Sequence, residues 1–193
     1  MRSWLGIWLC YALFGPPVAT ITAAALTEQR APAHTTVLVL GDSLSAAYGM
    51  APRQGWVALL AEKLGAMHPP HRVVNASISG ETTAGGRSRL PRLLSQHRPV
   101  LVVIALGAND GLRGLPPATM EENLNAMAQA VRVQGSRLVL AGMRLPPNYG
   151  AAYDRQFRSV FERVAASQGA VLVPFLLEGF ADRRELFQSD GLH

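Results

Sequence analysis

The sequence predicts an α/β fold: a single three-layer domain in which a five-stranded parallel, doubly wound sheet carries helices on both faces. Two observations lead to this prediction. Five short apolar runs rich in β-branched residues alternate with longer segments of helical spacing. Glycine-containing polar loops follow the first three runs. In parallel sheets, ligands bind at loops of this kind, beyond the carboxyl ends of the strands. The expected strand order is the flavodoxin-like 2-1-3-4-5.

The apolar runs define the expected strands. They cover residues 36–40, 72–75, 100–105, 137–141 and 170–173. The third run, Val-Leu-Val-Val-Ile-Ala, is the most apolar, and we expect it at the centre of the sheet.

Apolar residues recur at helical spacing between these strands. The segments concerned are 56–64, 83–97, 117–134 and 151–168. Gly65 stands where the first of these helices should stop. The loop 107–117 contains three glycines and two prolines, and we expect it to gate access of a substrate.

The segment Gly-Asp-Ser-Leu-Ser at residues 41–45 places a serine directly after the first strand. Ser43 needs a base to become a nucleophile, and that base needs a third group to orient it. Asp190 and His193 are three positions apart, so they can meet across one turn. Asp190 would hold the tautomer of His193 while the other ring nitrogen faces Ser43. The pattern therefore predicts a catalytic triad.

A serine nucleophile also needs donors for the oxyanion that its attack creates. Two loops that follow strands could provide them. Gly80, in the loop after the second strand, could offer a backbone N–H with no side chain in the way. Asn109, after the third strand, could offer an amide N–H. Together with the N–H of Ser43, they predict an oxyanion hole of three donors.

Five blocks carry a resemblance to a known family. They are Gly-Asp-Ser-Leu-Ser at 41–45, Asn-Ala-Ser-Ile-Ser-Gly at 75–80, Gly-Ala-Asn-Asp-Gly-Leu-Arg-Gly at 107–114, Arg-Leu-Pro-Pro-Asn-Tyr-Gly at 144–150 and Asp-Gly-Leu-His at 190–193. In this order they resemble the SGNH (GDSL-type) hydrolases, in particular the subgroup of thioesterase I/lysophospholipase L1 and the arylesterases. The similarity covers about residues 35–193.

The resemblance implies a serine ester hydrolase that needs no cofactor. Its catalytic residues would be Ser43, Asp190 and His193, and its oxyanion donors Ser43, Gly80 and Asn109. The implied substrates are small acyl esters, thioesters and lysophospholipids. We expect the loops 107–117 and 144–150 to line the acyl groove.

The chain departs from the family after His193, where family members continue into a turn and a final helix packed on the sheet. That helix is absent from the sequence, so we expect residues 36–193 to form a C-terminally truncated hydrolase domain. Two alternatives to the esterase stay open. One is a catalytically inactive binding module, because of the truncation. The other is a carbohydrate O-acetyl esterase on the same scaffold.

Residues 1–25 have the pattern of a secretory signal peptide: Arg2, an apolar stretch from Trp4 to Phe14, and small residues before position 26. Residues 26–35 form an expected flexible lead-in. Cleavage would remove Cys10, the single cysteine, and lower the net charge from +5 to +4 by removing Arg2. We therefore expect a periplasmic or secreted monomer whose mild basicity suits transient contact with a membrane surface.

Other polar residues are expected to be structural. The sequence predicts no metal site, because no histidine pair has ligand spacing, and His34, His68, His71 and His97 are expected in polar loops or at helix ends. It predicts no nucleic-acid partner, because the arginines of 87–98 lack interleaved aromatic residues and should form a solvated helix face. We expect Asp110 to bond its own backbone in a turn.

Overall fold

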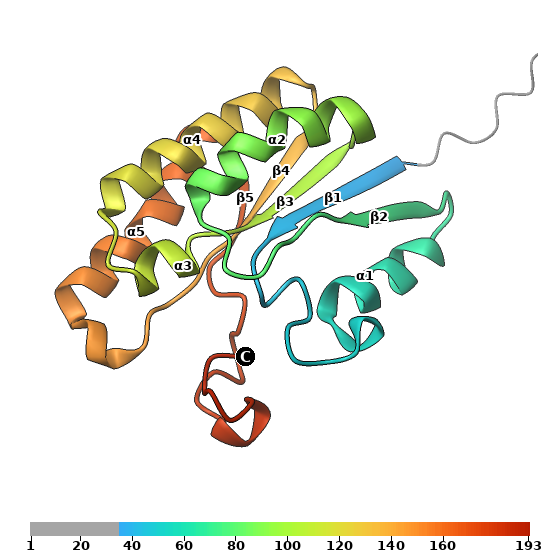
Figure 1. Ribbon diagram of the computed structural model, residues 1–193. Helices are drawn as coiled ribbons and strands as arrows, with labels where there is room; N and C mark the ends of the chain where they lie inside the picture. The colour runs from blue at the N-terminus through green and yellow to red at the C-terminus, as the bar shows by residue number, and fades with distance from the viewer. Residues whose placement is uncertain (1–34) are drawn as a thin grey trace, which may run out of the picture. The chain divides into compact units, whose positions relative to one another are not determined.

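Strand β1 (Thr35–Gly41) lies inside a parallel sheet with the order β2-β1-β3-β4-β5 (Figure 1). The computed structural model describes residues 35–193, so the predicted signal peptide and the lead-in before Thr35 lie outside the described residues. The remaining strands are β2 (His71–Asn75), β3 (Leu101–Ala105), β4 (Arg137–Ala141) and β5 (Val171–Val173). The predicted parallel sheet and its strand order are confirmed.

The two faces of the sheet are covered by different helices. The helices are α1 (Trp56–Gly65), α2 (Thr83–His97), α3 (Ala108–Leu112), α4 (Pro117–Val133) and α5 (Ala151–Gln168). In Figure 1, α2, α4 and α5 lie on one side of the sheet and α1 on the other. This is the predicted three-layer arrangement, with more helices on one face than on the other.

Successive side chains of β1 point to opposite faces of the sheet, so this strand contributes to the core on both faces. Leu38 and Leu40 are buried in the larger core, together with side chains of α2, α4 and α5. Val37 and Val39 are buried in a smaller cluster with Val57 of α1. A strand buried on both faces reads as a continuous apolar run, as β1 and β3 do in the sequence.

One local prediction was wrong, and the gating role of 107–117 stays a prediction. Gly65 is the last residue of α1 rather than its stop, and Ala66 caps the helix. The predicted gating loop contains the short helix α3. It is also bonded to its neighbours, because the hydroxyl of Tyr149 donates to Leu112 O at 2.8 Å and that of Tyr153 to Leu115 O at 2.7 Å.

After β5 the chain returns below the carboxyl edge of the sheet (Figure 1). Residues 174–193 contain one short 3-10 helix (Arg184–Leu186) and carry Asp190 and His193. Loops after β1, β2 and β3 reach the same edge. The sheet thus brings together segments that are far apart in the sequence. Within residues 35–193, no helix is long and apolar enough to span a membrane.

Candidate active site

Ser43 lies in the turn that directly follows β1. The N–H of Ala46 donates to Asp42 O at 2.9 Å and closes this turn. Gly41 allows the side chain of Ser45 to pack against the backbone of the strand end, because a Cβ at position 41 would lie 2.5 Å from Ser45 Oγ. The end of a central strand therefore fixes where the serine hydroxyl is presented.

The predicted triad residues lie in hydrogen-bond contact. His193 Nε2 lies 2.7 Å from Ser43 Oγ, although 150 positions separate them in the chain. His193 Nδ1 lies 2.7 Å from Asp190 Oδ2. The other carboxylate oxygen, Asp190 Oδ1, accepts the N–H groups of Leu192 at 2.9 Å and of His193 at 3.0 Å. The carboxylate is thus held by its own loop and orients the imidazole.

These contacts also set the charge of the carboxylate. The N–H of Leu192, followed by the ring of His193, lowers the pKa of Asp190 to about 2. Asp190 therefore stays ionised at neutral pH and can stabilise a protonated imidazole. The ring of Tyr48 covers that of His193 at a centroid distance of 4.7 Å. Gln188 Nε2 donates to Tyr48 O at 2.7 Å and joins the loop of the base to that of the serine.

The loop after β2 is bonded to the serine turn. The N–H of Ile78 donates to Gly41 O at 3.0 Å, and Asn75 Nδ2 donates to Ser45 O at 2.7 Å. Gly80 follows with φ of +78°, a backbone conformation that residues with a side chain rarely adopt. The course of this loop therefore favours glycine at position 80.

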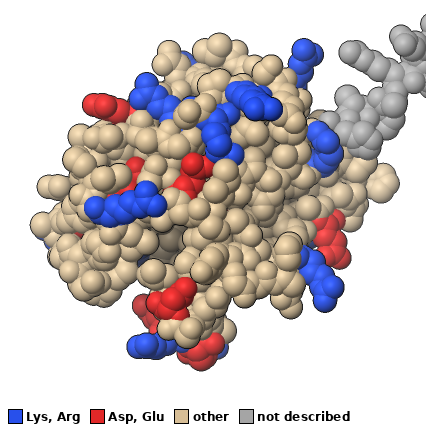
Figure 2. All heavy atoms as spheres, viewed as in Figure 1, with Lys and Arg blue, Asp and Glu red and all other residues tan. Residues whose placement is uncertain are grey.

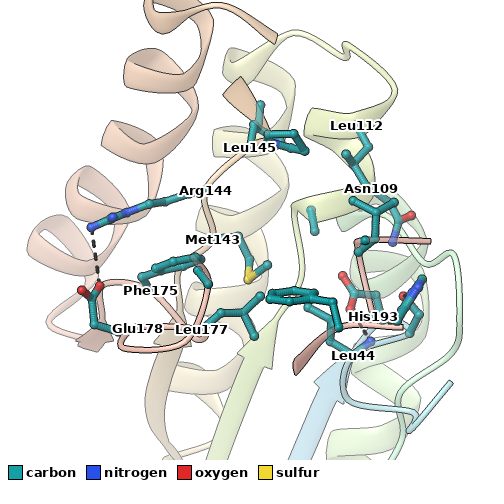
Figure 3. A pocket seen from close by; sticks show the side chains of 18 of the residues that line it. Leu44, Asn109, Leu112, Met143, Arg144, Leu145, Phe175, Leu177, Glu178 and His193 are labelled. Atoms are coloured by element: carbon teal, nitrogen blue, oxygen red, sulfur yellow. Dashed lines mark hydrogen bonds and ion pairs between the residues drawn. The ribbon is translucent and has the colours of Figure 1, made fainter. Parts of the chain in front are cut away.

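Asn109 is the second residue of α3, and Figure 3 shows it at the same end of the cavity as His193. Its Nδ2 donates to Glu81 O at 3.0 Å, which fixes the amide against the Gly80 loop. Within residues 35–193, the N–H groups of Ser43 and Gly80 have no protein acceptor. The predicted donors thus come from adjoining loops, and two of them are free to bind a ligand oxygen.

A cavity of about 450 Å³ opens beside Ser43 and His193. Figure 3 shows Leu44, Asn109 and His193 at one end, Arg144 and Glu178 at the other, and Met143, Phe175 and Leu177 between them. The guanidinium of Arg144 lies 4.8 Å from the ring centroid of Phe175 and 3.5 Å from Glu178 Oε2. The cavity therefore has an apolar middle, with the serine and an ion pair at its two ends.

Both loops that we expected to line a groove do so. Ala108, Asn109 and Leu112 belong to one, and the segment 144–147 to the other. The segment 175–182 lines the same cavity and was not predicted from the sequence. Its signal in the sequence is weak, because Phe175 and Leu177 stand in a stretch without a motif or a regular period.

Comparison with known proteins decides the family. Residues 39–193 match the GDSL-like lipase/acylhydrolase family. The chain belongs to this family. It is 52% identical to Esterase TesA of Pseudomonas aeruginosa over 89% of this chain and 85% of that protein. It is 42% identical to Thioesterase 1/protease 1/lysophospholipase L1 of Escherichia coli K12, over 85% of this chain and 77% of that protein.

The fold agrees with this assignment. The crystal structure of TesA superposes with a TM-score of 0.80 at 52% identity, covering 82% of this chain and 88% of that one. The predicted SGNH (GDSL-type) resemblance is confirmed, and the protein is an enzyme, an ester hydrolase of the GDSL family.

Asp110 of this GDSL hydrolase does not behave as predicted. We expected a turn residue that bonds its own backbone. Its side chain is instead buried, with 2% exposed, and accepts from Thr83 N at 2.8 Å and from Thr83 Oγ1 at 2.5 Å. A partner in another helix, 27 positions away, was not visible in the local sequence pattern.

The arginines of α2 do not all form a solvated face. Arg89 bonds Glu81 and donates to Ala76 O at 2.9 Å, and Arg87 Nη1 donates to Asn123 Oδ1 at 3.2 Å. Arg89 therefore supports the loop after β2, whereas Arg87 joins α2 to α4. On the face shown in Figure 2, the basic side chains are separated by uncharged ones rather than joined in a stripe.

The prediction for the histidines holds for His68 and His97, which lie in a loop and at the end of α2. It was wrong for His71, which opens strand β2 and has a buried Nδ1 without a hydrogen-bond partner. His34 lies outside the described residues. Within residues 35–193, no group of three or more His, Cys, Asp or Glu side chains could hold a metal ion.

Asp42, which the sequence analysis did not single out, lies beside the nucleophile and lines the cavity. Only 3% of it is exposed. Burial raises its pKa to about 6, although the N–H of Leu44 donates to its Oδ1 at 3.2 Å and acts in the opposite direction. A second carboxyl group with a shifted pKa thus lies close to the candidate triad of this GDSL hydrolase.

Proposed function

We propose that this hydrolase cleaves acyl esters and thioesters through Ser43, His193 and Asp190, with a covalent acyl-enzyme intermediate. The observation that carries the proposal is the unbroken chain of two 2.7 Å contacts from Ser43 Oγ through the His193 ring to Asp190 Oδ2. Each contact has the length that proton transfer and tautomer control require.

In the first half of the reaction, Ser43 Oγ bonds to the acyl carbon while its proton passes to His193 Nε2. The carbonyl electrons move to the oxygen, which becomes the oxyanion. Its collapse restores the carbonyl and breaks the bond to the leaving alkoxide or thiolate. The leaving group takes the proton from His193. Asp190, ionised at neutral pH, stabilises the imidazolium between these two proton transfers.

In the second half, water attacks the acyl carbon and gives one proton to His193. Collapse of this second oxyanion breaks the bond to Ser43 Oγ, which takes the proton back from His193, and the acid is released. The N–H groups of Ser43 and Gly80 and the amide of Asn109 would hold the oxyanion in both halves. A donor of this kind contributes about 3 kcal/mol in other hydrolases. The unpaired state of the two backbone N–H groups supports this role.

The cavity supports acyl chains as the part of the substrate that is bound. Its apolar middle, with Met143, Phe175 and Leu177, would hold several methylene groups. We infer that small acyl esters, acyl thioesters and lysophospholipids are substrates, the range suggested by the names of the relatives. A carbohydrate O-acetyl ester would leave this apolar space unfilled.

We further propose that the mature enzyme is a periplasmic or secreted monomer that contacts membrane surfaces transiently. The pattern of residues 1–25 supports export. Exposed apolar side chains from loops at the carboxyl edge of the sheet support the membrane contact, among them Tyr48 at 53%, Ile78 at 48% and Leu192 at 40% exposure.

Hydrolysis of p-nitrophenyl esters from acetate to decanoate tests the reaction and the acyl preference together. We expect turnover that rises with chain length up to the capacity of the cavity, and its complete loss in Ser43→Ala. A fluorophosphonate probe should label the parent protein and not the variant. Equal rates in both proteins would exclude Ser43, and an optimum at acetate would favour the acetyl esterase. A folded protein that neither turns over nor labels would be the inactive binding module.

A further inference from the structure

Three buried polar side chains form a network that the catalytic scheme does not use. They are Thr83, Asp110 and Asn123, with 0%, 2% and 6% of their surface exposed. Asp110 accepts from Thr83 N at 2.8 Å and from Thr83 Oγ1 at 2.5 Å. Asn123 Nδ2 donates to the same Thr83 Oγ1 at 3.1 Å. Buried polar groups of this kind cost free energy unless they are paired, and each of these three side chains has a partner.

The network joins three helices at the edge of the candidate site. Thr83 is the first residue of α2, directly after the loop that carries Gly80. Asp110 lies in α3, next to Asn109. Asn123 lies in α4 and is itself bonded by Arg87. The network therefore connects the two segments that supply the oxyanion donors outside the serine turn.

Two kinds of contact besides this network join the α3 segment to the Gly80 loop, and neither is fully buried: Arg113 Nη2 donates to Gly80 O at 2.9 Å, and Asn109 makes the second contact. The side chain of Asn109 contacts the Gly80 loop through one partly buried hydrogen bond, from Nδ2 to Glu81 O at 3.0 Å. Asp110 fixes the same two segments through two buried bonds. Oxyanion donors lie about 2.7–3.1 Å from the developing charge, and they must be held within about 0.5 Å of that geometry to be effective.

We propose that Asp110 and Thr83 are positioning residues that hold Asn109 against the Gly80 loop, in the geometry of one oxyanion hole. The inference rests on the proposed function, because it assigns these residues to that oxyanion. Neither residue lines the cavity, so neither touches the substrate.

The chemistry of the pair explains why aspartate stands at this position. A carboxylate accepts at both oxygens, whereas an amide accepts at only one. Thr83 offers two donors, its N–H and its hydroxyl, and the hydroxyl oxygen already accepts from Asn123. Asparagine at position 110 would therefore leave one donor of Thr83 without an acceptor.

A double-mutant cycle between Thr83→Val and Asn109→Ala, measured as kcat on a p-nitrophenyl ester, tests the proposal. Valine has the shape of threonine but removes the hydroxyl. We expect Thr83→Val to lower kcat by about tenfold or more with little change in KM, since a lost oxyanion donor costs about a hundredfold or more. In the Asn109→Ala background, the same change should lower kcat by less than about threefold.

Two further variants complete the test. Thr83→Ser keeps the hydroxyl and should retain kcat within about threefold. Val131→Ala removes buried volume near the far end of α4, and it should lower the melting temperature while leaving kcat unchanged. If Thr83→Val does not fold, Asp110→Asn, which keeps the volume and one acceptor, takes its place in the cycle.

Equal losses in both backgrounds, or an unchanged kcat in Thr83→Val, would overturn the positioning role. The Ser43→Ala comparison separates this result from a failure of the proposed function. If Ser43→Ala abolishes turnover and the cycle is additive, only the inference about Thr83 and Asp110 fails. If Ser43→Ala is as active as the parent protein, the proposed function fails first.

Discussion

At the scale of single residues, the loop that carries Asp190 decides the charge of its carboxylate. Two N–H groups of residues 192 and 193 donate to one oxygen, and the imidazole contacts the other. The folded pKa of about 2 lies below the ordinary value of 3.8, so the interactions that favour the ionised form are lost only as pH falls towards 2. Asp190 should therefore not titrate over the working range of the enzyme.

Replacing Asp190 with Asn tests its role in holding the imidazole. An amide at this position favours the wrong tautomer of His193 and cannot stabilise the imidazolium. We expect kcat to fall by roughly a thousandfold or more, as in other serine hydrolases. Glu185→Gln is the matched control, because Glu185 is an exposed carboxylate of the same segment that pairs with Arg183. Similar rates for the two variants would remove Asp190 from the triad.

The pKa of Asp42 is shifted in the opposite direction, upwards, and this shift should make the free energy of unfolding depend on pH. Burial raises its folded pKa to about 6 from 3.8, so protonation favours the folded state. The stabilising contribution is complete below about pH 3.8 and is lost as pH rises through 6. Between pH 4.5 and pH 8, the parent protein should therefore lose roughly 2 kcal/mol of unfolding free energy relative to Asp42→Asn. Urea unfolding of both proteins at the two pH values measures this difference, and a constant difference would contradict it.

At the scale of elements, the apolar runs were sufficient to predict the sheet. Five runs that alternate with helical segments can close into few parallel topologies, and β2-β1-β3-β4-β5 is one of them. The short helix α3 escaped prediction because its five residues include two polar side chains and a glycine. Its conformation depends on contacts with Thr83 and Glu81 rather than on its own sequence.

The cavity wall from residues 175–182 was also beyond the local pattern. If this wall binds the acyl chain, Leu177→Trp should shorten the accepted chain. A bulkier side chain beside Met143, in the middle of the cavity, takes the space of about two methylene groups, each worth about 0.8 kcal/mol. We expect kcat/KM for the octanoate ester to fall roughly tenfold while that for acetate stays unchanged.

Leu186→Trp is the control for this change, because Leu186 is 52% exposed and does not line the cavity. Parallel kcat/KM profiles across the ester series for Leu177→Trp and the parent protein would place the acyl chain elsewhere.

At the scale of the whole molecule, the sequence predicted that the candidate residues would lie close together, because its motifs follow strands. Ser43, Gly80 and Asn109 each come after an apolar run, and parallel strands end at one edge. The network of Thr83, Asp110 and Asn123 could not be located in this way. Its members are joined by the packing of α2, α3 and α4, which no periodicity in one segment encodes.

The proposed export of the protein can be tested at residues 1–25, the expected signal peptide. A signal peptide depends on an uninterrupted apolar stretch, and a charged residue within such a stretch costs about 2.5–3.5 kcal/mol on membrane insertion. Leu9→Arg should therefore leave the precursor unprocessed in the cytoplasm. The parent protein should be recovered from the periplasm or the medium. Its mass should be that of a chain whose N-terminus lies near residues 23–26.

The matched control is Leu59→Arg, which adds the same charge at a 50% exposed position of α1 and should not change processing. Mass spectrometry of each cell fraction, with ester hydrolysis measured in parallel, distinguishes the outcomes. An unprocessed parent protein in the membrane fraction would show an anchor in place of a signal peptide. In that case the hydrolase would work at the membrane surface permanently, because the apolar stretch that directs export would also hold the enzyme there.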